Sequence, residues 1–164
     1  MSYCNQETIT DKAFENLKGI YALKMAHCFQ HTISDKAFEN LKEINTLDIS
    51  NCRQITDKAF ENLKDIYTLN MSGCNQTKIT DKAFENLKFV RNLGISWCNQ
   101  NTITDKAFEN LKNLHYSIMD ECGQETITDK AFKNLKKVRL IRMRNFDEEK
   151  LSDETINWLK KVRW

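Results

Sequence analysis

Residues 79–88 read ITDKAFENLK, and this decapeptide governs the fold because the chain repeats it. Identical copies begin at residues 9, 55 and 103, and copies with one changed residue begin at 33 and 127. The six cysteines keep the same period, with spacings of 24, 24, 22, 24 and 24 residues. The short unit lacks two residues between Cys52 and Ile55, which predicts a surface loop there. A fixed period of this length is typical of repeat proteins.

Each repeat combines two periodicities. In residues 9–20, ITDKAFENLKGI, apolar residues fall at i, i+4, i+5, i+8 and i+11, which predicts a helix with one buried face. Thr10 or Asp11 can cap the start of that helix. In residues 67–74, YTLNMSGC, apolar and polar residues alternate, which predicts a short strand. The unit is therefore a strand, a turn at the cysteine, a helix and a return.

These units cannot stand alone, because one unit leaves two apolar faces in water, so they must stack. Parallel strands joined by crossovers are almost always right-handed. The sequence therefore predicts an α/β fold, a right-handed solenoid with a parallel sheet on its concave face and helices on its convex face. We expect one solenoid over residues 1–164, with repeats in 1–146 and a divergent capping helix in 147–164, which contains Trp158.

One stretch carries a family resemblance. Residues 66–87, IYTLNMSGCNQTKITDKAFENL, resemble the cysteine-containing leucine-rich repeat, and the likeness extends over essentially the whole chain. The near-identical units also resemble repeat arrays of giant viruses that infect amoebae. In cellular proteins this subtype is best known as the substrate-recognition arm of F-box ubiquitin-ligase adaptors. The resemblance thus implies a horseshoe fold and a role in protein recognition. No F-box can be placed, because the first repeat begins at residue 1.

The two ends of the array differ. Residues 1–4 align with the end of a strand whose earlier part is missing from the sequence. We therefore expect an uncapped apolar edge on the first unit, which invites pairing with another copy of the chain. A small exposed patch that is tolerated, or a longer array from which the chain was trimmed, is the alternative.

Composition excludes several classes. The net charge of +2 argues against a protein built mainly to coat nucleic acid or membranes. No apolar run approaches the length of a membrane helix, and no secretory signal is visible. We expect an intracellular protein, in the cytoplasm or a host cytoplasm, with reduced cysteines. One cysteine per unit, without CxxC or an adjacent histidine, predicts buried structural thiols and no metal site.

No pattern of catalytic residues is present. The three histidines, His27, His31 and His115, fall in different columns of the repeat, and no HExxH, GxSxG or P-loop occurs. The aspartates of the decapeptide are helix starts, and its lysines and glutamates fit a solvated face. We therefore expect no enzyme, no cofactor and no small-molecule substrate.

The strand segments vary between otherwise similar repeats. Their outward positions are small or polar in the first four units, and large, apolar or charged in the last two. Because Trp, Tyr and Arg are enriched at the energetic centres of interfaces, we predict a protein-binding site on the C-terminal half of the concave sheet. Its residues are Trp97, Tyr116, Ile118, Asp120, Arg142 and Arg144.

Two points stay open within this site. Asp120 and Glu121 can instead pair with Arg142 and Arg144 on the next strand. Ser117 stands where other strands have leucine or isoleucine, so either its hydroxyl finds a backbone acceptor or the register shifts and turns the next residue inward.

The basic segment Lys130–Arg144 could meet an anionic partner such as RNA, but it spans both faces and acids follow it. We therefore expect a non-enzymatic protein-interaction scaffold that recognises a substrate or host protein through its concave face. The alternative is a structural protein that assembles through its N-terminal edge.

Overall fold

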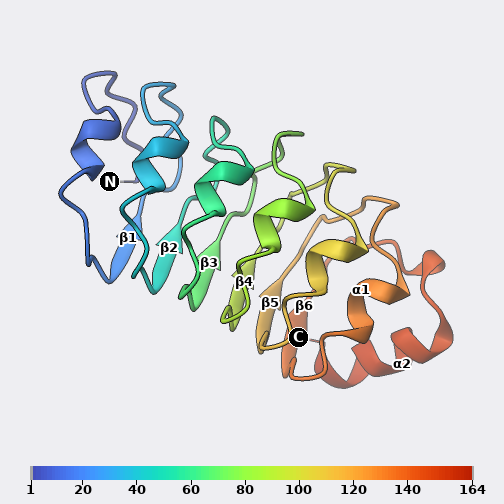
Figure 1. Ribbon diagram of the computed structural model, residues 1–164. Helices are drawn as coiled ribbons and strands as arrows, with labels where there is room; N and C mark the ends of the chain where they lie inside the picture. Colours follow the sequence, from blue (N-terminus) through green and yellow to red (C-terminus); the bar gives the residue numbers. More distant parts are fainter. Residues whose placement is uncertain (1, 164) are drawn as a thin grey trace.

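The computed structural model describes residues 2–163 and contains one open sheet of six parallel strands (Figure 1). The strands are hydrogen-bonded in chain order, so each repeat lies directly beside the next. They are β1 (Ala22–Lys24), β2 (Thr46–Asp48), β3 (Thr68–Asn70), β4 (Asn92–Gly94), β5 (Tyr116–Ile118) and β6 (Leu140–Arg142). We call each helical turn with its following strand a coil. The predicted leucine-rich-repeat solenoid is confirmed.

The central residue of every strand points into the core, and the register is constant from β1 to β6. Ser117 pairs with Leu93 and Ile141, the equivalent positions of its neighbours. It is buried, and its hydroxyl donates to the carbonyl oxygen of Leu93 at 3.4 Å. The register shift considered for this strand is therefore wrong, and Tyr116 and Ile118 stay on the outer face.

The helical side is slimmer than predicted. Five coils form four-residue 3-10 turns in place of full helices, and the sixth forms a five-residue α-helix. These elements are η1 (Asp11–Phe14), η2 (Asp35–Phe38), η3 (Asp57–Phe60), η4 (Asp81–Phe84), η5 (Asp105–Phe108) and α1 (Asp129–Lys133). Sheet strands lie about 4.7–4.9 Å apart, whereas packed α-helices need about 8–10 Å between their axes. Tighter 3-10 turns let the coils stay close on both sides.

The core is a set of columns in which like residues stack on like. Each helical turn buries its phenylalanine, and each return buries a leucine and a second aliphatic residue, except that coil 1 keeps the last two only half-buried. The phenylalanines are Phe14, Phe38, Phe60, Phe84, Phe108 and Phe132. A fully buried side chain of this size contributes about 1.5–3 kcal/mol. The columns therefore supply the main apolar stabilisation of the array.

The aspartate of the decapeptide joins neighbouring coils. Asp81 in coil 4 accepts two hydrogen bonds from Thr104 in coil 5, from its backbone N–H at 2.7 Å and from its hydroxyl at 2.8 Å. The pairs Asp11–Ser34, Asp35–Thr56, Asp57–Thr80 and Asp105–Thr128 repeat this geometry. The same hydroxyl caps its own turn, as Thr104 does for η5. We call each such contact an aspartate clamp.

The cysteines form a buried file, as predicted. All six are free thiols, and all but Cys4 are fully buried. Cys52, Cys74 and Cys122 donate to backbone carbonyls of the preceding coil, with sulfur–oxygen distances of 3.2, 3.2 and 3.0 Å. Burial raises the pKa of these three thiols to about 12. They are therefore protonated, structural groups at neutral pH.

A longer helix lies over the last coil (Figure 1). Helix α2 (Asp153–Val162) follows the short turn η6 (Glu148–Lys150), within the segment where a divergent helix was predicted. Leu159 is buried, and the Trp158 ring lies 6.2 Å from the ring of Phe132. The helix thus covers apolar side chains of coil 6.

We predict that Asp81→Ala lowers the free energy of unfolding by about 2 kcal/mol, because the N–H and hydroxyl of Thr104 lose their shared acceptor. Urea unfolding followed by circular dichroism measures the effect. Asp65→Ala is the matched control, since it removes an exposed carboxylate and should change stability by less than about 0.5 kcal/mol. Equal effects of the two substitutions would contradict a stabilising role for the clamp.

Candidate functional site

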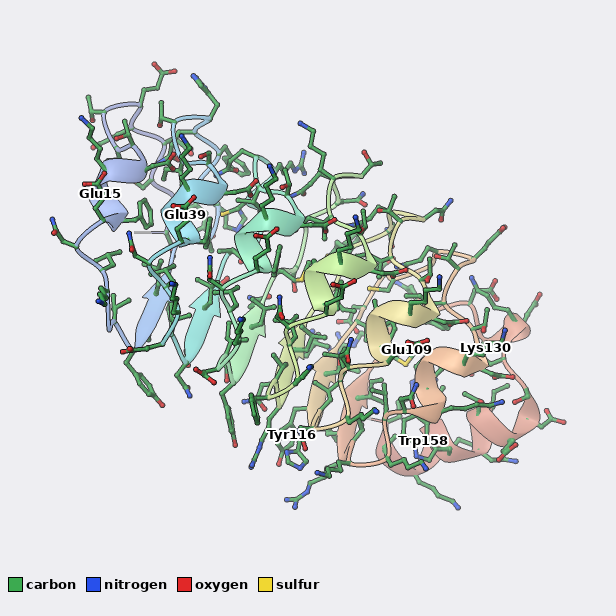
Figure 2. The ribbon with its side chains drawn as sticks, viewed as in Figure 1. Glu15, Glu39, Glu109, Tyr116, Lys130 and Trp158 are labelled. Carbon is green, nitrogen blue, oxygen red and sulfur yellow. The ribbon has the colours of Figure 1, made fainter. Side chains whose placement is uncertain are left out.

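The outer face of the sheet changes character between β4 and β5. Strands β2 to β4 present Thr, Asp, Asn and Gly, which are half-buried against one another. On β5, Tyr116 is 46% exposed and Ile118 is 37% exposed, and both point away from the core. Tyr116 lies at the strand side of the array, apart from the row of Glu15, Glu39 and Glu109 on the helical turns (Figure 2). The two side chains form the apolar centre of the predicted site.

Two of the predicted site residues are bonded to each other. Asp120 is only 8% exposed, and its carboxylate accepts from Arg142 Nε at 2.7 Å and from the backbone N–H of Arg144 at 2.9 Å. The pairing of Asp120 with Arg142 that the sequence left open is therefore confirmed. Glu121 accepts instead from the side-chain amide of Asn145. Asp120 thus holds β6 against β5 and positions Arg142 beside Ile118.

Trp97 and Arg144 lie beyond the C-terminal ends of their strands. Trp97 has a left-handed backbone, with φ of 63°, and its side chain is 58% exposed. Its N–H donates to the carbonyl oxygen of Asp120 at 2.9 Å, so the turn after β4 is fastened to coil 5. Arg144 is exposed. Of the predicted residues, Tyr116 and Ile118 therefore lie on the sheet, Trp97 and Arg144 lie past the strand ends, and Asp120 is buried.

A further row of side chains that are partly or fully exposed was not predicted. It lies where each coil returns from the helical turn to the strand, and it holds Tyr67, Arg91, His115 and Arg139. The Arg91 guanidinium lies 4.9 Å from the centre of the Tyr67 ring. Partial burial, followed by the charges of Arg139, Arg91 and Lys137, lowers the pKa of His115 below 6.5. An alignment of the repeats by column shows this row in the sequence.

The comparisons with known proteins agree with this architecture. The family model of the BspA type Leucine rich repeat region matches residues 7–139 in six copies. The chain belongs to this family. No curated protein matches this leucine-rich repeat chain in sequence.

Three solved structures with similar folds were compared with this leucine-rich repeat chain. The yeast complex of Rad7 and Elc1 aligns at 17% identity and a TM-score of 0.67, over 89% of this chain and 42% of that one. The complex of TLR13 with ssRNA13 aligns at 21% identity and a TM-score of 0.68, over 88% of this chain and 20% of that one. The Toll–Spatzle complex of Drosophila aligns at 15% identity and a TM-score of 0.54, over 84% of this chain and 22% of that one. The chain thus spans less than half of each matched chain, and these identities establish the fold alone.

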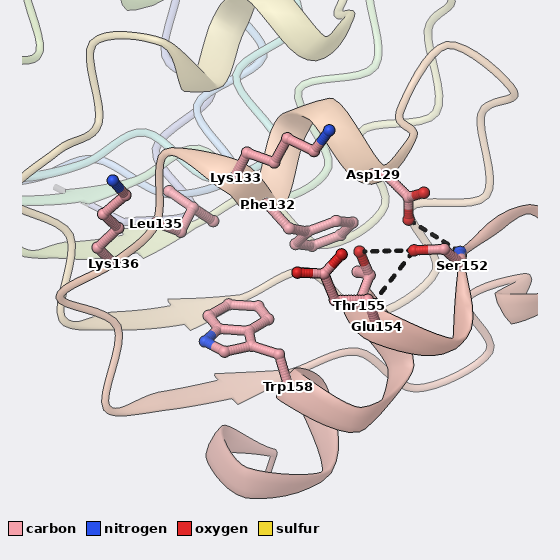
Figure 3. Close-up of a pocket in the computed structure, with 9 residues that line it drawn as sticks. All are labelled: Asp129, Phe132, Lys133, Leu135, Lys136, Ser152, Glu154, Thr155 and Trp158. Carbon is pink, nitrogen blue, oxygen red and sulfur yellow. Dashed lines mark hydrogen bonds between the residues drawn. The ribbon is translucent and has the colours of Figure 1, made fainter.

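An open groove of about 470 Å³ separates the last leucine-rich repeat from α2 (Figure 3). Phe132 and Trp158 form its apolar wall, and Lys133 lies on the α1 side. Asp129 accepts from the backbone N–H of Ser152 at 2.9 Å, which extends the file of aspartate clamps to the start of α2. The groove therefore follows from the way α2 docks on the array.

Within residues 2–163, no three His, Cys, Asp or Glu side chains gather closely enough to hold a metal ion. None of the helices in the same residues is long and apolar enough to cross a bilayer.

Asp129 gives the docking of α2 a pH dependence. The hydrogen bond from Ser152 lowers the pKa of Asp129 below 3.8. The folded state therefore favours the carboxylate, whose contribution is complete above about pH 4 and is lost as the pH falls through the lowered folded pKa. We predict that Asp129→Asn lowers stability by about 1 kcal/mol at neutral pH. The gap between the two proteins should shrink below about pH 4 in urea unfolding. A gap that stays constant with pH would contradict this assignment.

Proposed function

We propose that this leucine-rich repeat protein is a non-enzymatic scaffold that binds a partner protein through the outer face of β5 and β6. One observation carries the proposal. Tyr116 and Ile118 are exposed side by side on a sheet whose earlier strands present small or polar residues. Exposed aromatic residues beside arginine are typical of interface centres. Arg142 lies beside Ile118, and Trp97 and Arg144 lie past the C-terminal ends of β4 and β6.

Two of the similar solved structures support a protein partner by analogy. Rad7 and Toll are each described in a complex with another protein, Elc1 and Spatzle. The sequence resemblance to the recognition arm of F-box adaptors adds the idea that the partner is a substrate or host protein chosen for modification. We place this recognition inside the cell, where buried free thiols such as Cys74 stay reduced.

We predict that replacing Trp97, Tyr116 and Ile118 by alanine removes specific partners without unfolding the protein. All three side chains are exposed, so their loss should leave the urea midpoint nearly unchanged. In a quantitative pull-down from cell lysate, true partners should fall about tenfold relative to the unmodified chain, as expected for loss of interface centres. Arg142 is left intact because it is bonded to Asp120.

The matched control changes three exposed residues of coil 2, Lys36, Glu39 and Asn40, to alanine. It should recover the same proteins as the unmodified chain. We call the outer face of β5 and β6, with Trp97 at its rim, the strand face. If the variant of Trp97, Tyr116 and Ile118 and the control recover identical sets of proteins, the strand face is not the binding site.

A second candidate function is self-association through coil 1. Ile9, Leu17 and Ile20 are only half-buried, whereas the equivalent residues of coils 2 to 5 are fully buried. The outer residues of β1 are also exposed, in contrast to those of β2. A sheet edge with uncovered apolar side chains favours pairing with another copy.

We predict that the sedimentation coefficient rises with protein concentration if coil 1 is the contact. Replacing Ile9 and Leu17 by lysine should abolish the rise, because charges would enter the contact. Phe89→Lys is the control, since it removes an exposed apolar side chain elsewhere. A coefficient that is constant with concentration for the unmodified chain would exclude self-association.

A further inference from the structure

The edge at which the chain returns from helical turn to strand becomes strongly basic in coils 4 to 6. Each coil carries a lysine at the start of this return. The residues that follow the lysine determine the net charge of the return. In coils 2 and 3 they include the acids Glu43 and Asp65. In coils 4 to 6 they include no acid. We call the resulting set the basic edge, and its six members that are charged at neutral pH are Lys88, Arg91, Lys112, Lys136, Lys137 and Arg139.

Backbone hydrogen bonds fix the members of the basic edge next to each other. The N–H of His115 donates to the carbonyl oxygen of Arg91, and the N–H of Arg139 donates to that of His115, each at 2.9 Å. The next column is also tied, because Lys137 Nζ donates to Asn113 Oδ1 at 2.7 Å. Arg91 and Arg139 are therefore two strand steps, about 10 Å, apart, with His115 between them.

The positive charge of this edge is not neutralised within the described chain. The three ion pairs found in residues 2–163 involve Arg142, Lys150 and Arg163, none of which belongs to the basic edge. Burial lowers the pKa of His115 most, and the nearby positive charges lower it further. All six charged side chains are exposed. Like charges held this close repel one another, so an anionic occupant would relieve the repulsion.

Apolar side chains border the basic edge on two sides. Phe89 precedes Arg91 by two residues and is 58% exposed. Tyr116 directly follows His115, with ring centres 6.5 Å apart, and leads onto the outer face of β5. The surface thus offers cations with aromatic contacts at its margin.

We propose that the basic edge binds a short, extended acidic segment of a partner protein. The segment would lie across coils 4 to 6, with an adjoining apolar side chain against Tyr116. The proposal rests on the proposed function only in taking the occupant to be a protein. It assigns a surface that adjoins the outer face of β5 and shares only Tyr116 with it.

The dimensions favour a peptide over a nucleic acid. Two steps between strands span about 10 Å, which about three extended residues can cover. Single-stranded nucleic-acid sites of OB-fold proteins extend over about 4–16 nucleotides. Asp65 and Glu43 lie next along the edge and would repel a longer polyanion. Charge and length together match a local run of Asp or Glu.

The test measures fluorescence anisotropy of a labelled oligoglutamate peptide that ends in leucine. The intact chain should bind it, with affinity falling as salt is added. Arg91→Gln with Arg139→Gln should weaken binding about fivefold, because two exposed charge pairs are lost. Lys12→Gln with Lys36→Gln is the control, since it removes the same charge from coils 1 and 2 and should leave the affinity unchanged. Asp65→Asn should strengthen binding about twofold by lengthening the basic edge.

A spectroscopic readout identifies the position of the peptide. Bound carboxylates should raise the pKa of His115, measured by NMR titration of its ring. Equal loss of affinity in the edge variant and the control would overturn the proposal. So would tighter binding of a single-stranded RNA oligonucleotide that also depends on Arg91 and Arg139. These variants leave Trp97, Tyr116 and Ile118 intact, so failure here is distinct from failure of the strand face.

Discussion

The parallel ladder sets the distance between neighbouring coils, and every other contact must repeat at that distance. Strands in a sheet lie about 4.7–4.9 Å apart. A buried side chain therefore lies next to the side chain at the equivalent position of the neighbouring coil, as the buried Phe84 of η4 lies between η3 and η5, which carry Phe60 and Phe108. The same constraint limits the helical side to short 3-10 turns such as η4. The aspartate clamp adds a polar contact with the same period.

This constraint explains which parts of the decapeptide must be constant. Asp81 and Thr104 need each other across the coil boundary, and Phe84 needs its neighbours in the core. Lys82, between Asp81 and Phe84, is exposed, yet it is equally invariant. Duplication of a gene segment would give such identity without any role in binding. Invariance among internal copies therefore identifies structural residues only when a contact between coils accompanies it.

The sequence was sufficient for the sheet, the core columns and the thiol file, because each depends on a period that can be counted. It did not predict the 3-10 turns, since Phe14, Leu17 and Ile20 satisfy a three-residue period as well as a helical stripe. Predicting the aspartate clamp would require knowing which hydroxyl lies across the coil boundary. The pair of Asp120 with Arg142 was foreseen as one alternative, and only coordinates could choose it.

The turn after each strand is where folding constrains the side chain least. Each of the six coils places a residue with positive φ there, and this column holds His27, Asn51, Gly73, Trp97, Glu121 and Asn145; Tyr3, before the first coil, has the same conformation. The conformation disfavours non-glycine residues by about 1–2 kcal/mol. It persists because the same N–H continues the ladder, as Trp97 does toward Asp120. Glycine or asparagine would meet that backbone requirement with less strain. An exposed tryptophan at this position therefore needs a reason other than folding, and a binding surface that includes Trp97 would supply one.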